Sequence, residues 1–126
     1  MIPALILTHG HLGEMLMDAV EKVLGPQTDV MVLSNDDCSL EQLQLNVEAR
    51  LGDNSCVLFV DFCGGSPYVA CKALRENHPN YAVISGVNLP MLFSFFTKRQ
   101  QHPFAELVEV VKTDGLRGIQ LLADGA

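Results

Sequence analysis

The fold is indicated most clearly by residues 4–33, ALILTHGHLGEMLMDAVEKVLGPQTDVMVL, in which two short apolar runs flank a segment with helical spacing. Runs 4–7 and 30–33 are apolar at consecutive positions, which is typical of strands buried on both faces of a sheet. Between them, apolar residues recur at intervals of three and four until Gly25-Pro26, a common helix stop. The stretch therefore predicts a strand, a helix with one buried face and a second strand.

Three further apolar runs continue this alternation along the chain. Runs 57–60 and 81–84 predict two more strands, and the final run, 119–122, predicts a fifth. Repeated alternation of strands and helices implies right-handed crossovers and a mostly parallel sheet with helices on both faces. We therefore expect an α/β fold with an open, doubly wound sheet of order 2-1-3-4, extended by a C-terminal edge strand that comes either from the same chain or by exchange between subunits.

Local signals locate the other helices. Ser39-Leu40-Glu41-Gln42 fits a capping box, in which the Ser39 side chain accepts from the Gln42 amide. A third helix is expected to begin at Pro67, because a missing N–H costs nothing at that position, and to end before Pro79. Weaker helical patterns follow at 89–96 and from 103 to about 112.

Composition limits the class of protein. With 126 residues and 48% apolar content, the chain can close one core, so residues 1–126 are expected to form a single domain. The start has no signal-peptide pattern and no apolar run is long enough to cross a bilayer, so we expect a cytoplasmic protein without direct membrane insertion. A net charge of −7 argues against nucleic acid as a partner and favours a partner with a basic face.

The candidate site lies where the first and third strands end. Order 2-1-3-4 places these strands side by side at the topological switch point, where ligands bind in such folds. The first strand leads into His9-Gly10, and the third into Asp61. Neutral histidine is a good nucleophile, and a neighbouring carboxylate can fix its tautomer by accepting from one ring nitrogen. Gly10 has no side chain and would let an incoming group approach closely.

An anion site is expected next to this pair. Gly64-Gly65-Ser66 leads into the third helix, so backbone N–H groups and the positive end of the helix would face a ligand there. The Ser66 hydroxyl could cap the helix and donate to a phosphoryl oxygen. Each feature has an ordinary explanation as a loop, turn or cap, but their combination at one switch point favours a phosphohistidine on His9.

The other histidines do not indicate a metal centre. His9 and His11 form an H-x-H pair, but His78 and His102 are expected in surface turns next to prolines, so no third ligand has suitable spacing. The four cysteines form no C-x-x-C pair, which argues against a zinc or redox motif. We expect neither a metal nor another cofactor, and we interpret His11 as a residue at the rim of the site.

Three motifs resemble those of the mannose-type IIA domains of the bacterial sugar phosphotransferase system: 8–10 (THG), 61–68 (DFCGGSPY) and 86–92 (GVNLPML). The resemblance implies that His9 accepts a phosphoryl group from the carrier protein HPr and passes it to a IIB domain. It also implies that Asp61 orients His9 and that Ser66 lies beside it. Members of this family are dimers in which a C-terminal strand, here 119–122, completes the sheet of the neighbouring subunit.

Three other functions remain to be compared with this hypothesis. A histidine phosphatase or mutase would need an arginine before the histidine, where this chain has Thr8. A receiver domain could use Asp61 but would also need acidic residues after the first strand to bind Mg²⁺. A stand-alone regulatory phosphoprotein, in which phosphorylation of His9 controls partner binding without sugar transport, has the same sequence signals.

Overall fold

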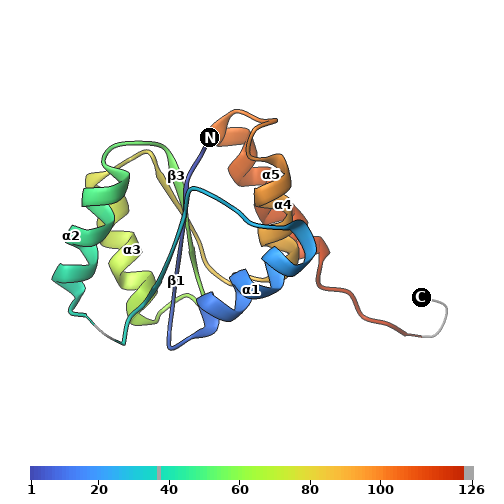
Figure 1. The fold of residues 1–126 in the computed structure, drawn as a ribbon, viewed down its shortest axis with the longest axis horizontal. Coiled ribbons are helices and arrows are strands. Elements are labelled where there is room, and N and C mark those ends of the chain that lie inside the picture. The colour runs from blue at the N-terminus through green and yellow to red at the C-terminus, as the bar shows by residue number, and fades with distance from the viewer. Residues whose placement is uncertain (37, 124–126) are drawn as a thin grey trace.

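The computed structural model describes residues 1–36 and 38–123. In these ranges strands and helices alternate as predicted, up to two consecutive helices at the end (Figure 1). In chain order the elements are β1 (Ala4–Thr8), α1 (Leu12–Leu24), β2 (Val30–Ser34), α2 (Leu40–Leu51), β3 (Cys56–Val60), α3 (Ser66–Asn77), β4 (Tyr81–Ile84), α4 (Leu89–Lys98) and α5 (Phe104–Arg117).

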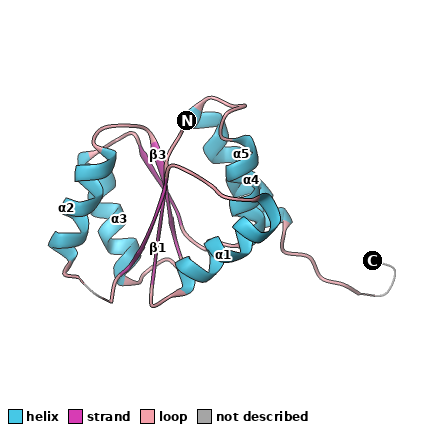
Figure 2. Ribbon diagram, in the orientation of Figure 1, coloured by secondary structure: helices cyan, strands magenta, loops and turns pink. Residues whose placement is uncertain are grey.

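The sheet has the predicted topology. Its four strands are parallel and lie in the order β2-β1-β3-β4. Helices α2 and α3 cover one face, and α1, α4 and α5 cover the other (Figure 2). Since β1 and β3 are neighbours, the loops that follow them lie at the same edge of the sheet, as the sequence predicted.

Two apolar clusters hold the layers together, one on each face of the sheet. Successive residues of β1 alternate between them: Leu5 packs toward α2 and α3, whereas Ile6 packs toward α1, α4 and α5. Both side chains are fully buried. Phe59 of β3 meets Phe95 of α4 edge to face, with ring centroids 5.4 Å apart. Consecutive apolar residues in β1 and β3 are therefore explained by burial on both sides.

Most helix bounds agree with their local signals, including the end of α1 before Gly25 and the end of α3 before Pro79. The capping box is present, with Ser39 Oγ accepting from the Gln42 amide at 3.2 Å. Helix α5, in contrast, continues to Arg117, beyond the expected end near residue 112. Its last turns are held on α4, because Asp114 accepts from Ser94 Oγ and from Lys98 Nζ. That tertiary contact has no signature in the local sequence.

The predicted fifth strand does not form within the chain. Residues 119–122 pair with no strand of the described sheet, and Ile119, Leu121 and Leu122 are exposed. Helix α5 packs against α4 rather than the sheet edge, and the segment after it leads away from the molecule (Figure 1). The edge strand is therefore not formed by this chain itself, and its exchange between subunits stays a prediction. Across the described residues, no helix is long and apolar enough to span a bilayer.

Candidate functional site

His9 and Asp61 meet at the carboxyl ends of β1 and β3. One carboxylate oxygen of Asp61, Oδ2, lies 2.7 Å from His9 Nδ1 and also accepts from the His9 backbone N–H at 2.9 Å. The Asp61 side chain is 9% exposed, whereas that of His9 is 44% exposed. The histidine is therefore fixed from its protein side while its ring remains accessible from solvent.

The protonation state of this pair follows from the hydrogen bonds. Partial burial by itself would raise the pKa of Asp61, but hydrogen bonds from the His9 backbone, the His9 ring and the Phe62 backbone outweigh it, so the pKa lies below its ordinary value. Asp61 is ionised at neutral pH and can only accept, so Nδ1 of His9 carries the proton. Nε2 then presents its lone pair away from the carboxylate.

An aromatic ring holds the imidazole from one face. Phe62 stacks on His9 with ring centroids 5.1 Å apart and an interplanar angle of 10°. A Cβ atom at Gly65 would lie 2.8 Å from His9 Cε1 and 3.0 Å from Phe62 Cζ, so only glycine fits beside the two rings. The sequence did not reveal this role of Phe62, although its place directly after Asp61 is a usable signal.

The roles of the predicted glycines are only partly as expected. Gly10 and Gly64 have φ angles of +54° and +107°, which favour glycine. A Cβ at Gly10 would be 3.9 Å from its nearest neighbour and one at Gly64 would meet nothing within 4 Å, so packing within the chain does not require glycine there; the approach of an incoming group past Gly10 stays a prediction. Gly65 is the position where the missing side chain makes room.

Ser66 begins α3 and faces solvent, but it does not cap the helix. Gly65 occupies the N-cap position, and no side-chain cap is formed there. The predicted cap is wrong because Ser66 lies one residue inside the helix. Its hydroxyl oxygen instead accepts from Asn35 Nδ2 at 2.8 Å. The first N–H groups of α3 have no partner within the helix and remain available to an anion.

Two further contacts fix the framework of the site. Thr8 is fully buried, and its Oγ1 accepts from the Gly13 amide at 2.9 Å, which ties the start of α1 to the end of β1. The Asp61 backbone oxygen accepts from the Gly86 amide at 3.1 Å, which ties the loop after β4 to the end of β3. Neither contact was predicted, because each joins segments that are separate in the sequence.

The other histidines contact carboxylates of their own and do not contact the His9–Asp61 pair. His11 is 80% exposed and lies 3.5 Å from Glu14, on α1. His78 lies in the turn before β4, as expected, but its side chain is only 11% exposed because it bridges Glu48 and Asp53. No three His, Cys, Asp or Glu side chains are grouped as metal ligands within 1–36 and 38–123.

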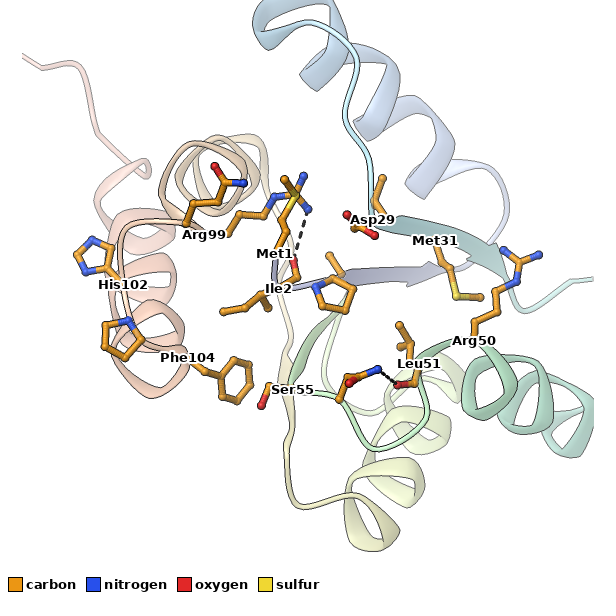
Figure 3. A pocket seen from close by; sticks show the side chains of 16 residues that line it. Met1, Ile2, Asp29, Met31, Arg50, Leu51, Ser55, Arg99, His102 and Phe104 are labelled. Atoms are coloured by element: carbon orange, nitrogen blue, oxygen red, sulfur yellow. Dashed lines mark hydrogen bonds between the residues drawn. The ribbon is translucent and has the colours of Figure 1, made fainter.

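A large open cavity lies at the opposite edge of the sheet, where the strands begin (Figure 3). Its volume is about 890 Å³. The buried Arg99 contributes to its wall and donates to the backbone oxygens of Ile2 and Thr28. This arginine fastens the start of the chain and the segment before β2 to the end of α4. The cavity is thus separated from His9 by the length of the strands.

Comparison with known proteins identifies the family. A model of the EIIA-man family, described as a phosphotransferase system (PTS) fructose IIA component, matches residues 4–112. The chain belongs to the EIIA-man family. It is a mannose-family PTS IIA component, as the three sequence motifs indicated.

Individual relatives agree with this assignment. The EIIA-man chain is 34% identical over 128 residues to the mannose-specific EIIAB component of Escherichia coli K12, covering 96% of this chain but 39% of that protein. It is 31% identical over 94 residues to the sorbose-specific EIIA component of Klebsiella pneumoniae, covering 72% of this chain and 70% of that one. The chain thus spans less than half the length of the first relative.

Solved structures show the same fold. The EIIA component of the phosphotransferase system from Streptococcus agalactiae superposes with a TM-score of 0.88, covering 95% of this chain and 96% of that one. Sequence identity in this comparison is 24%, so it bears on the fold alone. The parallel arrangement that brings the ends of β1 and β3 together is therefore shared by this EIIA-man chain and that protein.

Proposed function

We propose that the chain is a cytoplasmic phosphocarrier in which His9 accepts a phosphoryl group from phospho-HPr and passes it to a IIB domain. The observation that carries this proposal is the 2.7 Å contact between Asp61 Oδ2 and His9 Nδ1, which leaves Nε2 as the unprotonated and accessible nitrogen. Membership of the EIIA-man family supports the assignment of donor and acceptor.

In the first step, the Nε2 lone pair attacks the phosphorus atom carried by the donor. The new N–P bond forms as the bond between phosphorus and the donor breaks, and the electron pair of that bond stays with the donor. The proton on Nδ1 does not move, so the phosphorylated ring carries a positive charge that Asp61 stabilises through the existing hydrogen bond.

In the second step, a nucleophile on the acceptor attacks the same phosphorus atom. The N–P bond breaks, and its electron pair returns to Nε2, which restores the starting tautomer. Between the two steps, the phosphoryl oxygens lie beside the start of α3, where Ser66 and the free backbone N–H groups can donate to them. The helix end adds a positive potential equivalent to roughly half an elementary charge.

The surface and the free C-terminal segment support the proposed partners. A net charge of −7 suits a donor with a basic face, and Phe62, which stacks on His9, exposes apolar surface beside the reactive ring. We also propose a homodimer, in which residues 119–122 of one subunit pair with the free edge of β4 in the other. A cavity of about 500 Å³ alongside β4, lined by apolar residues such as Val83, Val108 and Leu116, supports that arrangement.

Phosphorylation in a reconstituted system tests the proposal. The protein is incubated with labelled phosphoenolpyruvate, enzyme I and HPr, and the bound phosphate should be labile in acid and stable in alkali, as a phosphoramidate is. His9→Ala should abolish labelling because it removes the nucleophile, whereas His11→Ala, a matched control two residues away, should retain it. Labelling that persists in His9→Ala would falsify the assignment of the nucleophile.

A second stage of the same assay separates transport from regulation. Addition of an unlabelled mannose-family IIB domain to the purified phosphoprotein should remove the label from His9 and place it on IIB. A protein that is labelled by HPr but discharges to no IIB domain would instead support the stand-alone regulatory function. Absence of labelling in the wild-type protein would contradict both.

A further inference from the structure

Asn35 connects three parts of the site. It follows β2, the strand next to β1, so the sheet places it at the same edge as His9. Its backbone N–H donates to the Thr8 oxygen at 3.2 Å, and its side-chain Nδ2 donates to Ser66 Oγ at 2.8 Å. Asn35 therefore joins the end of β1 to the first residue of α3, from a position 31 residues before Ser66.

This hydrogen bond determines what the Ser66 hydroxyl can do. A hydroxyl has one proton and can accept through its lone pairs. Because Ser66 Oγ accepts from Asn35, its proton is directed elsewhere, and none of the hydrogen bonds among residues 1–36 and 38–123 uses it. Serines at later positions of a helix can donate to the carbonyl four residues earlier, but Ser66 is the first residue of α3. The proton is thus available to an acceptor beside His9.

We propose that Asn35 is a positioning residue that holds the Ser66 hydroxyl with its proton toward the phosphoryl group on His9. This inference rests on the proposed phosphocarrier function and extends it by a side chain from a third strand. Asn35 acts through Ser66, so it contributes only when that hydroxyl is present.

The other end of the Asn35 amide supports a functional rather than a stabilising role. Its Oδ1 is buried and has no hydrogen-bond partner in the described structure. A buried acceptor without a donor lowers the stability of the fold, so a contribution to stability does not explain why this side chain is present. Reversing the amide would leave an unpaired N–H₂ group in that place and would make the Ser66 hydroxyl the donor to Asn35, the arrangement that Asn35→Asp imposes. Removal of the side chain should therefore leave the melting temperature unchanged or slightly higher.

Transfer rates in a double-mutant cycle test the proposal. The rate of phosphoryl transfer from phospho-HPr is measured for the wild type, Asn35→Ala, Ser66→Ala and the double variant. Each single change should slow transfer by about 10- to 100-fold, the value expected for one hydrogen bond to a charged group. The double variant should be no slower than Ser66→Ala. Rate losses that multiply in the double variant would show that Asn35 does not act through Ser66.

Asn35→Asp should change the rate of phosphoryl transfer in a way that a purely structural role of Asn35 does not predict. An ionised carboxylate only accepts, so Ser66 would turn its proton toward residue 35 and away from the phosphoryl group. This variant should transfer more slowly than Asn35→Ala at neutral pH, where the new carboxyl is ionised. Transfer as fast as in Asn35→Ala at neutral pH would overturn the proposed direction of the hydroxyl.

Controls separate this inference from the proposed function. Asn80→Ala removes an exposed side chain at the opposite edge of the sheet, which makes one hydrogen bond of 3.3 Å to the Asp53 backbone oxygen, and should transfer at the wild-type rate. A wild-type protein that is labelled, with Asn35→Ala labelled equally fast, would overturn the inference and leave the function standing. A wild-type protein that is never labelled would overturn both.

Discussion

At the scale of single residues, the reactivity of the site comes from one carboxylate oxygen that contacts both the ring and the backbone of His9. Asp61 Oδ2 fixes the ring orientation through Nδ1 and fixes the loop through the backbone N–H. As an acceptor, Oδ2 selects the tautomer, and its negative charge stabilises the charge that the ring gains on phosphorylation. Geometry and charge therefore depend on the same atom.

Replacing this carboxylate by its amide removes the negative charge and keeps the shape of the side chain. Asp61→Asn should slow phosphoryl transfer by about 10- to 100-fold, because a neutral acceptor stabilises the phosphorylated ring less than a carboxylate does. Rapid-quench measurement of labelling gives the rate, and circular dichroism should show an intact fold. Val69→Ala, a change at an exposed apolar position on α3, serves as the control. An unchanged transfer rate in Asp61→Asn would remove this residue from the mechanism.

Prediction from sequence worked best for residues that directly follow strands. His9 and Asp61 could be paired in advance because a single rule, the order of parallel strands, brings their loops together. Asn35 could not be found in this way, since it follows an outer strand and belongs to no motif. The role of Ser66 as a cap was wrong by one position, because the N-cap depends on backbone angles that the residue type alone does not determine.

At the scale of helices and strands, His78 joins the ends of α2 and α3. Its two ring nitrogens each lie 2.8 Å from a carboxylate, Nε2 from Glu48 and Nδ1 from Asp53. The ring also stacks on Tyr81 of β4, with centroids 4.5 Å apart. With an acceptor at each nitrogen, the doubly protonated ring is the form that satisfies both contacts.

The stability contributed by His78 should depend on pH. The hydrogen bond with Glu48 raises the pKa of His78, burial opposes this change, and Asp53 adds to the rise, so the pKa lies above its ordinary value of 6.5. A raised folded-state pKa stabilises the fold fully below pH 6.5, and this contribution is lost as the pH rises through the folded-state pKa. The difference in melting temperature between the wild type and His78→Gln should therefore be largest below pH 6.5 and decrease above it.

His102→Gln is the matched control for this measurement. His102 also lies near a carboxylate, with Nδ1 3.0 Å from Glu106, but it makes one such contact rather than two. Its substitution should change the melting temperature less than that of His78 at low pH. A melting-temperature difference for His78→Gln that stays constant from pH 5 to pH 9 would contradict the bridging role.

Prediction of the elements themselves failed mainly at the C-terminal end of α5. The capping box of α2 is contained in four residues, so it could be found in the sequence. The last turns of α5 depend on Asp114 meeting Ser94 and Lys98 of α4, and a contact between two helices has no local pattern. The same limit applies to His78, whose acidic partners lie 25 and 30 residues earlier in the chain.

At the scale of the whole molecule, the exposed apolar end and the free sheet edge both point to the proposed dimer. Deletion of residues 119–126 should convert the dimer into a monomer, because the segment that would pair with β4 of the neighbour is removed. Size-exclusion chromatography with light scattering measures the mass. Leu45→Asp, at an exposed position on α2, should remain dimeric. A truncated chain with the mass of a dimer would show that another surface holds the subunits together.

The predicted topology of the whole sheet was confirmed, whereas the final strand was not formed by the chain alone. Alternating buried and amphipathic segments specify parallel order with little ambiguity. An apolar run such as 119–122 indicates only that the segment is suited to burial, and not which chain buries it. Sequence periodicity contains no information on that choice.

The hydrogen bond between the Gly86 amide and the Asp61 backbone oxygen connects the surface beside β4 to the residue that orients His9. Gly86 also lines the cavity beside β4, together with Ile119. A neighbour that occupies this cavity would be two hydrogen bonds away from the imidazole, through Gly86 and then Asp61. The first of these hydrogen bonds joins main-chain atoms and the second joins side chains, so the surface that the proposed dimer would bury adjoins the residue that orients His9.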